Sequence, residues 1–444
     1  MRNLDNPFYH RGAIRHAHHF WGRTQETAQI LGLLRNGQSV SLIGPRRIGK
    51  SSLFLHLCRP EVRAPFNLAP PQALFVLVDC QELGGSPPDE VYDVLLQGVQ
   101  DAAASANLSL PPASEGDSYR TLDRALYQIT QEGVAIVVLL DEFELLASNE
   151  HLTPYFFARL RGLTTKYGLA YLTASQHPLF LITADEKILS SPFFNIFVTL
   201  PLGLMSEAEA RSLLQVRLQD TTIQFAPDIV NHVLELVGPH PFFLHVAGYH
   251  IYQMLADNNN MEFDALDTPI EIEAESHLGY LWQNLSQEAQ YALAISDGPV
   301  DIMRMLEQQC LLTPGEQGYR YTSEILRRFI RRQQVEGLIQ AGPFVIDPQK
   351  HQVKANGQEI NLTTSQFDIL VCLGKRMNDV VHGEELERTV WGDNIVKDPD
   401  RLKTLIKRLR RAIEPYGNWI VSERGVGYAL RPPTTGDALA ATNE

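Results

Sequence analysis

Short apolar runs alternate with amphipathic helical segments over the first two hundred residues of the chain. The apolar runs predict strands at 38–44, 73–79, 134–140, 169–175 and 196–200. The run 134–140 (VAIVVLL) has no polar residue, which is typical of a parallel strand buried on both faces of a sheet. Helical patterns over 88–107 and 153–166 lie between strands. The alternation predicts an α/β domain with a parallel sheet over 20–200.

A second pattern, helical throughout, begins at Ser206. Ser206 and Glu209 have the spacing of a capping box, in which each side chain bonds the other residue's backbone N–H. The apolar spacing that follows predicts a helical lid over 201–260. The stretch 256–269 (ADNNNMEFDALDTP) has the composition of a linker, and a small helical, winged-helix-like domain is expected over 261–342.

The last hundred residues combine short strands, helices and a final hairpin, which predicts an α+β domain over 343–432. Helical patterns cover 362–373, 382–393 and 400–414. In 400–414 the apolar side chains fall on one face when residues advance by about 100° each. They are Leu402, Leu405, Ile406, Leu409 and Ile413.

Charge is distributed unevenly along the 444 residues, whose formal net charge is −14. Residues 343–433 hold 14 Lys and Arg against 12 Asp and Glu, so the acidity lies elsewhere. A chain with this balance is not expected to coat nucleic acid along its whole length. Residues 1–19 are expected to form an N-terminal arm, and 433–444 (PTTGDALAATNE) to be disordered.

The four cysteines lie far apart and form no CxxC pair. This spacing fits a reducing compartment and favours neither a disulfide framework nor a zinc site. The sequence has no signal-peptide pattern and no uninterrupted apolar run of about 18 residues. A cytoplasmic protein without a membrane partner is therefore expected.

The segment 44–51 (GPRRIGKS) has the spacing GxxxxGK[ST] of a phosphate-binding loop, between a predicted strand and a predicted helix. Glycines in such a loop let backbone N–H groups face phosphates, the lysine reaches the β- and γ-phosphates, and the serine hydroxyl ligates Mg²⁺. The alternative is a chance glycine-rich turn. The predicted nucleotide-binding residues here are Gly44, Pro45, Arg46, Arg47, Ile48, Gly49, Lys50, Ser51 and Ser52.

Two acids, Asp141 and Glu142, follow the buried apolar run 136–140. An acid at the carboxyl end of a strand beside a phosphate-binding loop is placed to hold Mg²⁺, and Asp141 has this position. Glu142 is predicted to orient or deprotonate an attacking water, and Lys50 to complete the catalytic group. Two surface acids after an unrelated strand are the alternative.

Five segments in this order resemble the STAND/AAA-type P-loop ATPases, in particular their bacterial AAA-like and archaeal ATPase branches. They are FWGRTQE (20–26), the phosphate-binding loop, LLDEFELL (139–146), LTASQHPL (172–179) and VGPHPFFL (237–244). The resemblance covers about 6–335 and implies ATP and Mg²⁺ as cofactors. It further implies that Gly22 and Arg23 lie near the base and ribose, that Ser175 is a polar sensor beside the γ-phosphate, and that Pro241 packs on the adenine.

Two smaller groups have weaker signals. Arg159 and Arg161 are candidates for an arginine finger, and an exposed helix face is the alternative. His16, His18 and His19 lack a neighbouring Cys, Asp or second histidine pair at metal-ligand spacing, so a solvated arm is expected there.

The predicted helix 400–414 carries six basic residues between 401 and 411 and no acid among them. Thr404, Lys407 and Arg411 lie opposite the apolar face, with Arg408 beside them. Charged helix faces are usually only solvated. Six like charges repel one another, however, and such a face suits a phosphate backbone.

The region 343–432 resembles the OmpR/PhoB-type winged helix, through Trp391-Gly392, IKRLRRAIE and RGVGY. The resemblance implies a basic helix in the major groove of double-stranded DNA and a wing that places Arg424 near the minor groove, with Gly425 and Gly427 in its turn. A winged helix used only for protein contacts is the alternative. The predicted DNA contacts are Arg401, Lys403, Thr404, Lys407, Arg408, Arg411 and Arg424.

The two resemblances together predict an ATP-dependent transcriptional regulator, in which a slow ATPase acts as the switch and the winged helix binds DNA. An ATP-dependent homo-oligomer is expected, controlled by a signal that the sequence does not identify. One alternative is a DNA-remodelling or loading ATPase like the origin-recognition proteins. The other is an interaction scaffold in which ATP is structural.

Overall fold

The computed structural model describes residues 6–8, 12–110, 117–182, 192–219, 221–257, 263–316, 318–355, 357–392 and 399–433. The chain forms two compact units. The first is Met1–Ile270 with Gln308–Cys310, and the second is Glu271–Glu307 with Leu311–Glu444. The predicted disorder at 433–444 lies, apart from residue 433, outside the described residues.

A five-stranded sheet forms the centre of the first unit, in the order β2-β3-β4-β1-β5. All its strand pairs are parallel, as the unbroken apolar runs predict. The strands agree with the predicted ones within a residue or so at each end. They are β1 (Ser39–Ile43), β2 (Ala73–Asp79), β3 (Ala135–Asp141), β4 (Ala170–Ser175) and β5 (Phe197–Pro201).

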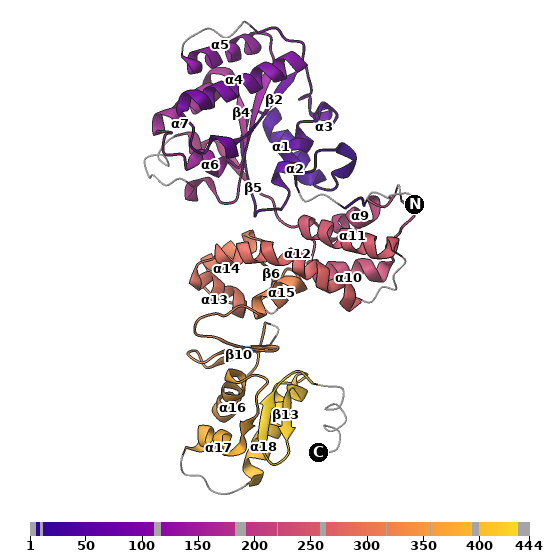
Figure 1. Ribbon diagram of the computed structural model, residues 1–444. Helices are drawn as coiled ribbons and strands as arrows, with labels where there is room; N and C mark the ends of the chain where they lie inside the picture. The colour runs from indigo at the N-terminus through magenta and orange to yellow at the C-terminus, as the bar shows by residue number, and fades with distance from the viewer. Residues whose placement is uncertain are drawn as a thin grey trace. The chain divides into compact units, whose positions relative to one another are not determined.

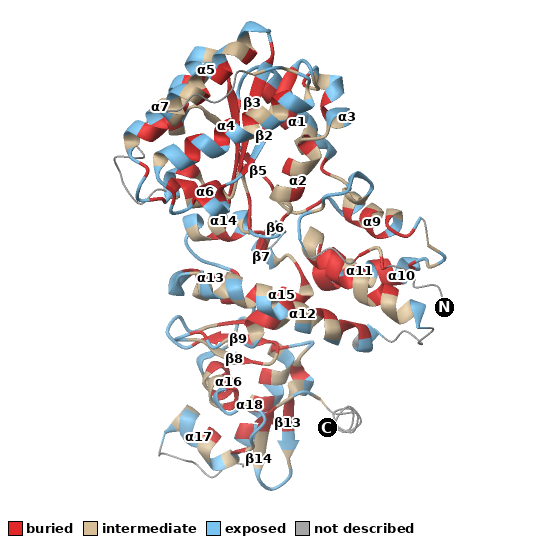
Figure 2. Ribbon diagram, turned by 45° about the horizontal axis from the view of Figure 1, so that its top comes forward, coloured by how far each residue is buried: buried red, intermediate tan, exposed pale blue. Residues whose placement is uncertain are grey.

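Helices cover both faces of this sheet, with α4, α5 and α7 on one side and α1 and α2 on the other (Figure 1). The α-helices of this layer are α1 (Thr24–Arg35), α2 (Lys50–Leu57), α3 (Pro60–Arg63), α4 (Pro88–Ser105), α5 (Ser118–Gln131), α6 (Phe143–Ala147) and α7 (Pro154–Tyr167). The short 3-10 helices are η1 (Ala17–His19), η2 (Ala64–Phe66), η3 (Cys80–Leu83), η4 (Leu179–Leu181) and η5 (Pro192–Asn195). The strands are largely buried and the outer helix faces are exposed (Figure 2).

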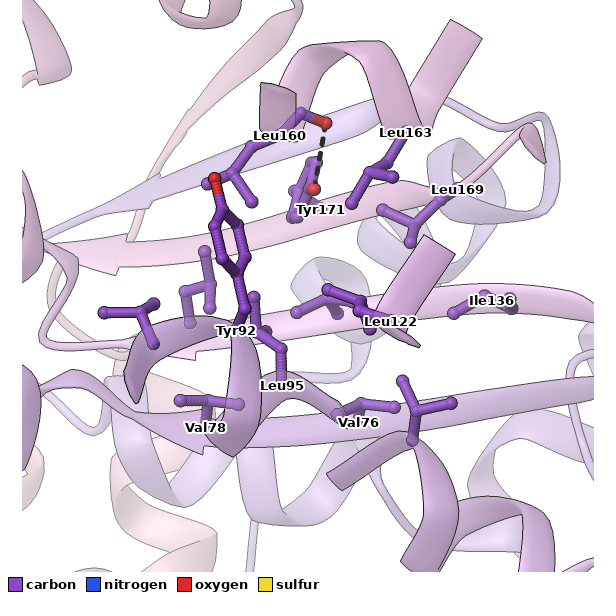
Figure 3. Close-up of a cluster of buried hydrophobic side chains, with 14 of the residues drawn as sticks. Val76, Val78, Tyr92, Leu95, Leu122, Ile136, Leu160, Leu163, Leu169 and Tyr171 are labelled. Atoms are coloured by element: carbon purple, nitrogen blue, oxygen red, sulfur yellow. Dashed lines mark hydrogen bonds between the residues drawn. The ribbon is translucent and has the colours of Figure 1, made fainter. Parts of the chain in front are cut away.

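Alternate residues of β3 enter two separate cores, because successive side chains of a strand point to opposite faces. Ile136 and Val138 pack with α4, α5 and α7, whereas Val137 and Leu139 pack with α1 and α2. In the first core the Tyr171 hydroxyl donates to the Leu160 carbonyl at 3.0 Å, so its polar atom is paired although the ring is buried (Figure 3).

Three further helices of the first unit form the predicted lid: α9 (Glu207–Val216), α10 (Pro227–Val237) and α11 (Pro241–Ala256). The capping box is confirmed, since Ser206 Oγ accepts from Glu209 N and the Glu209 carboxylate accepts from Ser206 N. The linker prediction for 256–269 is wrong for its second half, because α12 (Phe263–Gln283) begins there and contains Pro269. Buried side chains at four-residue spacing, including Leu266 and Ile270, favour the helix despite that proline.

The second unit begins at Glu271 within α12, and two helices and a hairpin follow, the order expected of a winged-helix-like domain. These elements are α13 (Gln287–Ile295), α14 (Val300–Gln308), β6 (Leu312–Gly315) and β7 (Gly318–Tyr321), followed by α15 (Glu324–Arg331). The Tyr291 hydroxyl donates to Asp347, and Lys354 Nζ lies 3.2 Å from Asp297 Oδ2. These pairs fix the small domain to the four-stranded sheet that follows it.

The rest of the second unit is the predicted α+β winged helix. An antiparallel sheet in the order β11-β10-β9-β8 precedes three helices and a second sheet in the order β12-β14-β13. The strands are β8 (Ile339–Ala341), β9 (Phe344–Asp347), β10 (Gln352–Ala355), β11 (Gln358–Glu359), β12 (Val381–His382), β13 (Ile420–Glu423) and β14 (Gly427–Leu430), with η6 (Gly417–Trp419). The helices are α16 (Thr364–Lys375), α17 (Gly383–Trp391) and α18 (Pro399–Ala412).

The fold class predicted from the sequence is therefore confirmed, from the parallel sheet and lid to the C-terminal winged helix. Among the residues that the structure describes, no helix has the length and apolar content needed to cross a bilayer.

Candidate functional site

A cavity of about 320 Å³ lies in the first unit at the carboxyl ends of β3 and β4, where open α/β sheets bind ligands. The predicted residues that line it are Arg23, the loop residues 46–52, Asp141, Glu142 and Pro241. Four other predicted residues, Gly22, Gly44, Pro45 and Ser175, do not line it. Its walls also include residues that were not predicted from the sequence: Gly12, Ala13, Ile14, Glu144, Gln176 and Phe242.

The phosphate-binding loop needs its glycines for two different reasons. Gly49 has φ of 104°, a backbone conformation that is strained for any residue with a side chain. Gly44 is buried against the connection after β5, and a Cβ there would lie 2.5 Å from the Leu202 carbonyl oxygen. The Gly44 N–H donates to the Ser175 carbonyl at 3.1 Å, which joins the loop to β4.

Lys50 is the first residue of α2, and its Nζ donates to the carbonyls of Gly44 at 2.7 Å and Pro45 at 3.1 Å. Burial lowers the pKa of Lys50, and the nearby carboxylates of Glu144, Asp141 and Glu142 oppose that effect. The ammonium group is thus held inside the curve of the loop, where the β- and γ-phosphates of a nucleotide are expected.

Asp141 and Ser51 meet beside the loop, as the magnesium prediction requires. The Ser51 hydroxyl and the Glu142 N–H, the latter at 3.0 Å, both donate to the Asp141 carboxylate. Burial raises the pKa of Asp141 despite these bonds. One carboxylate and one hydroxyl fit Mg²⁺, which is usually bound by few protein groups together with phosphates and waters. Among the described residues, no three His, Cys, Asp or Glu side chains are grouped to hold a metal alone.

Glu142 caps α6 with φ of 49°, an uncommon conformation for a residue that is not glycine. Burial raises its pKa, and repulsion from Glu144 and Asp141 adds to the effect. Its carboxylate is half-buried at the cavity wall. A strained residue with a raised pKa in a cleft is a candidate for proton transfer.

Ser175 and Gln176 occupy different positions at the end of β4. Ser175 is fully buried and its hydroxyl donates to the His177 carbonyl at 2.7 Å. Gln176 lines the cavity, and its backbone N–H and its Nε2 both donate to Glu144 Oε1 at 3.3 Å. The sensing role of Ser175 stays a prediction, and Gln176 is the polar group of this pair that faces the cavity.

Arg23 joins the N-terminal motif to the lid and the loop rather than standing alone. Its guanidinium donates to the Gly203 carbonyl at 2.7 Å and to the Ile48 carbonyl at 3.4 Å. Its backbone N–H donates to Glu209 Oε1 at 2.7 Å. At Gly22 a Cβ would lie 2.7 Å from the Met205 side chain, so glycine permits this close approach of the lid.

The lid closes one side of the cavity with Pro241, the first residue of α11, and with Phe242. The Arg47 guanidinium lies 5.1 Å from the Phe242 ring centroid, within cation–π distance. The loop and the lid therefore contact each other directly through these two side chains.

The weaker candidates lie outside the cavity. The Arg159 guanidinium lies 4.3 Å from the Tyr119 ring centroid and 4.6 Å from that of Tyr155. Arg161 is half-buried on the same helix. His16 and His18 are exposed, as expected of solvated side chains, and His19 is half-buried. Phe8, earlier in the N-terminal segment, is fully buried.

Lys50→Ala is expected to weaken ATP binding by about 1.5–3 kcal/mol, or roughly 10- to 100-fold, because a charge-assisted bond to the phosphates is lost. The measurement is equilibrium binding of a fluorescent ATP analogue to the full chain. Lys375→Ala removes an exposed lysine of α16 and serves as the matched control. Equal affinity of all three proteins would contradict the assignment of Lys50.

The second candidate site is the outer face of α18. All six predicted contacts on this helix are exposed: Arg401, Lys403, Thr404, Lys407, Arg408 and Arg411. The opposite face is packed into the winged-helix core through Leu402, Ile406 and Leu409. A helix anchored by its apolar face thus presents its charges outward, in the form that major-groove binding requires.

Two arginines of α18 have defined partners within the domain. Arg410 Nη2 donates to the Ile420 carbonyl at 2.7 Å and to Ser422 Oγ at 2.9 Å, which ties the helix to the hairpin. The Arg401 guanidinium lies 4.0 Å from the Trp391 ring centroid. Stacking on Trp391 orients the Arg401 side chain, which stays exposed to solvent.

The hairpin of β13 and β14 forms the predicted wing, with Arg424 exposed in its turn. Gly425 has φ of 76°, as the tight turn requires. Gly427 serves a different purpose, because a Cβ there would lie 1.9 Å from the Val381 carbonyl oxygen of β12. Tyr428 packs against the domain core.

Two family models match the chain. The model for Novel STAND NTPase 2 matches residues 27–297, more than half of the chain. The model for the C-terminal domain of transcriptional regulatory proteins matches residues 357–430. The first match covers the phosphate-binding loop, Asp141, Glu142 and the lid, and the second covers α18 and the wing.

Similar proteins agree with this division. The response regulator ArlR of Staphylococcus aureus is 33% identical over 108 residues, which are 24% of this chain and 49% of ArlR. The chain thus spans about half the length of the curated relatives it matches.

The Walker-type ATPase PABY2304 of Pyrococcus abyssi superposes with TM-score 0.53 and 17% identity, over 73% of this chain and 99% of that one. The ORC2 protein of Aeropyrum pernix gives TM-score 0.51 and 13% identity, over 73% and 96%. The two structural matches support the ATPase fold.

Proposed function

Because the chain belongs to the Novel STAND NTPase 2 family, we propose that it is an ATP-dependent transcriptional regulator. The observation that carries the proposal is the presence in one chain of a phosphate-loop cavity and an exposed basic helix on a winged-helix domain. The ATPase unit is the switch, and the winged helix is the output.

In this proposal the loop N–H groups and Lys50 hold the phosphates of ATP, and Ser51 and Asp141 hold Mg²⁺. When bound, Mg²⁺ neutralises charge on the β- and γ-phosphates. Glu142 orients the attacking water and accepts its proton, which its raised pKa favours. Arg47 and Phe242, in contact across the cavity, couple the loop to the lid.

On the DNA side, α18 enters the major groove and Arg424 of the wing lies near the minor groove. The lysines and arginines on the outer face contact phosphates and base edges, while Arg410 holds the wing against the helix. Binding is therefore expected to weaken as salt rises, because phosphate contacts release counterions.

Single substitutions on α18 distinguish base contacts from phosphate contacts. Lys407→Ala and Arg411→Ala are each expected to cost about 1–3 kcal/mol on a specific site and to relax sequence preference. Arg401→Ala should weaken specific and random DNA alike, because Arg401, in the first turn of α18, is assigned a phosphate contact, which carries no sequence information.

The measurement is a DNA titration of the full chain at several salt concentrations, with Lys375→Ala as the control. Equal losses on specific and random duplexes for all three variants would reduce the face to a non-specific patch.

The proposed function as a whole is tested by genome-wide DNA occupancy, together with transcript levels. Wild type is compared with Glu142→Gln and with Asp141→Asn. A regulator switched by ATP should show occupancy at promoters that differs between these proteins, with matching changes in transcripts. Occupancy confined to replication origins would favour a loading ATPase. Unchanged occupancy and transcripts would favour a scaffold.

A further inference from the structure

The N-terminal segment contacts both the lid and the helix that follows the phosphate-binding loop, within the first unit. Its described residues are 6–8 and 12–19. Gly12, Ala13 and Ile14 form part of the cavity wall. The contacts that hold this wall in place bind neither the phosphate-binding loop (44–51) nor the proposed magnesium ligands Ser51 and Asp141.

One end of the segment is anchored on the lid by Phe8, whose side chain is fully buried. Its ring stacks on that of Phe225, with centroids 5.7 Å apart, and meets His245 edge-on at 6.2 Å. The pocket for this ring exists because residue 248 of α11 is glycine. A Cβ at Gly248 would lie 2.5 Å from a carbon of the Phe8 ring.

Polar bonds flank this anchor. Asn6 Nδ2 donates to the Tyr249 carbonyl at 2.9 Å, and Asn6 Oδ1 accepts from the Phe8 N–H at 2.9 Å. Arg217, in the lid after α9, donates to the Pro7 carbonyl at 3.0 Å and to the His19 carbonyl. The lid thus holds the segment on both sides of the cavity wall.

The other end of the segment is attached to α2, the helix that begins at Lys50. The Ile14 N–H donates to Ser52 Oγ at 3.0 Å. Arg59 Nη2, just beyond α2, donates to the Arg15 carbonyl at 2.8 Å. A wall of the cavity is therefore tied to the lid through Phe8 and to the phosphate-binding helix through Ile14.

We propose that the described residues 6–8 and 12–19 act as a retaining strap over the nucleotide cavity, with Phe8 as the positioning residue that keeps the strap closed. The strap controls the rate at which a nucleoside diphosphate or triphosphate leaves the cavity. The phosphate-binding loop, with Ser51 and Asp141, makes the contacts to the phosphates and Mg²⁺. The inference rests on the proposed function in that it takes the cavity to be the nucleotide site.

In this proposal the wall moves away from the cavity together with the Phe8 ring, which leaves its pocket, because Phe8 and Gly12 are only four positions apart in the chain. Local opening is controlled by the burial lost in that movement, which is large for a fully buried aromatic ring. Weakening the Phe8 anchor should increase the fraction of molecules whose cavity wall is open, and nucleotide should therefore leave faster. The contacts between the loop and bound nucleotide should change less.

The experiment measures release of fluorescent ADP from the full chain after mixing with excess unlabelled ADP. Phe8→Ala is expected to release ADP about 10- to 100-fold faster than wild type. Gly248→Ala places a methyl group against the Phe8 ring from the lid side and should also speed ADP release. Phe8→Leu, which keeps most of the apolar volume, should lie between Phe8→Ala and wild type. Tyr127→Ala removes an exposed aromatic ring outside the cavity and should release ADP at the wild-type rate.

A second readout follows the strap without nucleotide turnover. Hydrogen exchange at the Ile14 amide should be faster in Phe8→Ala and Gly248→Ala than in Tyr127→Ala. Wild-type ADP release in both Phe8→Ala and Gly248→Ala would overturn the strap, even though ADP binding itself stands. Where Phe8→Ala fails to fold, Phe8→Leu and Gly248→Ala decide the outcome. Failure of wild type to bind ADP at all would instead overturn the proposed function.

Discussion

Glu142→Gln is expected to bind ATP with about wild-type affinity and to hydrolyse it roughly 10²- to 10⁴-fold more slowly. The amide keeps the size of the carboxylate and its position at the cap of α6, but it cannot accept a proton from water. Lys50, Ser51 and Asp141, the proposed partners of the phosphates and Mg²⁺, are unchanged in this variant. Loss of turnover with retained binding is the signature of a group that acts in the chemical step.

The measurement pairs phosphate release at saturating ATP with equilibrium binding of a fluorescent ATP analogue. Glu132→Gln makes the same chemical change at an exposed position after α5 and should leave both quantities unchanged. Hydrolysis by Glu142→Gln at the wild-type rate would show that Glu142 is not the catalytic carboxylate. Glu144, which also lines the cavity, would then be the next candidate.

The parts of the site that the sequence could predict are those that depend on contiguous residues. The spacing of Gly44, Gly49 and Lys50 already specifies a loop between a strand and a helix, and the structure has β1 and α2 at those places. Asp141 was predictable because a fully apolar run fixes where a buried strand ends. Both arguments use local order alone.

Other parts depend on contacts between distant residues, which one sequence does not reveal. Phe8 meets Gly248 across 240 positions, and nothing in either local pattern marks the pair. The choice between Ser175 and Gln176 depends on which side chain turns toward the cavity after β4 ends. Arg23 was placed near the base by resemblance, whereas its guanidinium bonds to carbonyls of the loop and of the connection to the lid.

The miss at 263–269 has a different physical cause. Asn, Asp and Pro favour turns in isolation, and the stretch contains Pro269. Burial of Leu266 and Ile270 on one face of α12 outweighs that preference. Tertiary packing therefore decided the structure where local propensity pointed to a linker.

ATP is expected to promote self-association of the full chain and to raise its affinity for paired half-sites by about 10²- to 10⁴-fold. One winged helix is a small DNA-binding module that buries on the order of 600–1,000 Å². A single copy of α18 and its wing should therefore bind weakly at physiological salt. Joining two copies makes the second binding step intramolecular and adds affinity without a new contact, provided that the half-sites lie about one helical turn apart.

The test combines light scattering with DNA titration of Glu142→Gln, which is expected to hold ATP without consuming it. Both are measured with ATP, with ADP and without nucleotide. Mass and affinity for paired half-sites should rise together with ATP, whereas affinity for a single half-site should change little. Lys50→Ala, which should bind ATP more weakly, should need a higher ATP concentration for the same rise in mass and DNA affinity. Constant mass and constant DNA affinity across the three nucleotide states would mean that ATP is not the switch. A rise in mass without a rise in affinity for paired half-sites would mean that self-association does not serve DNA binding. Avidity requires both winged helices of an assembly to contact the duplex at the same time.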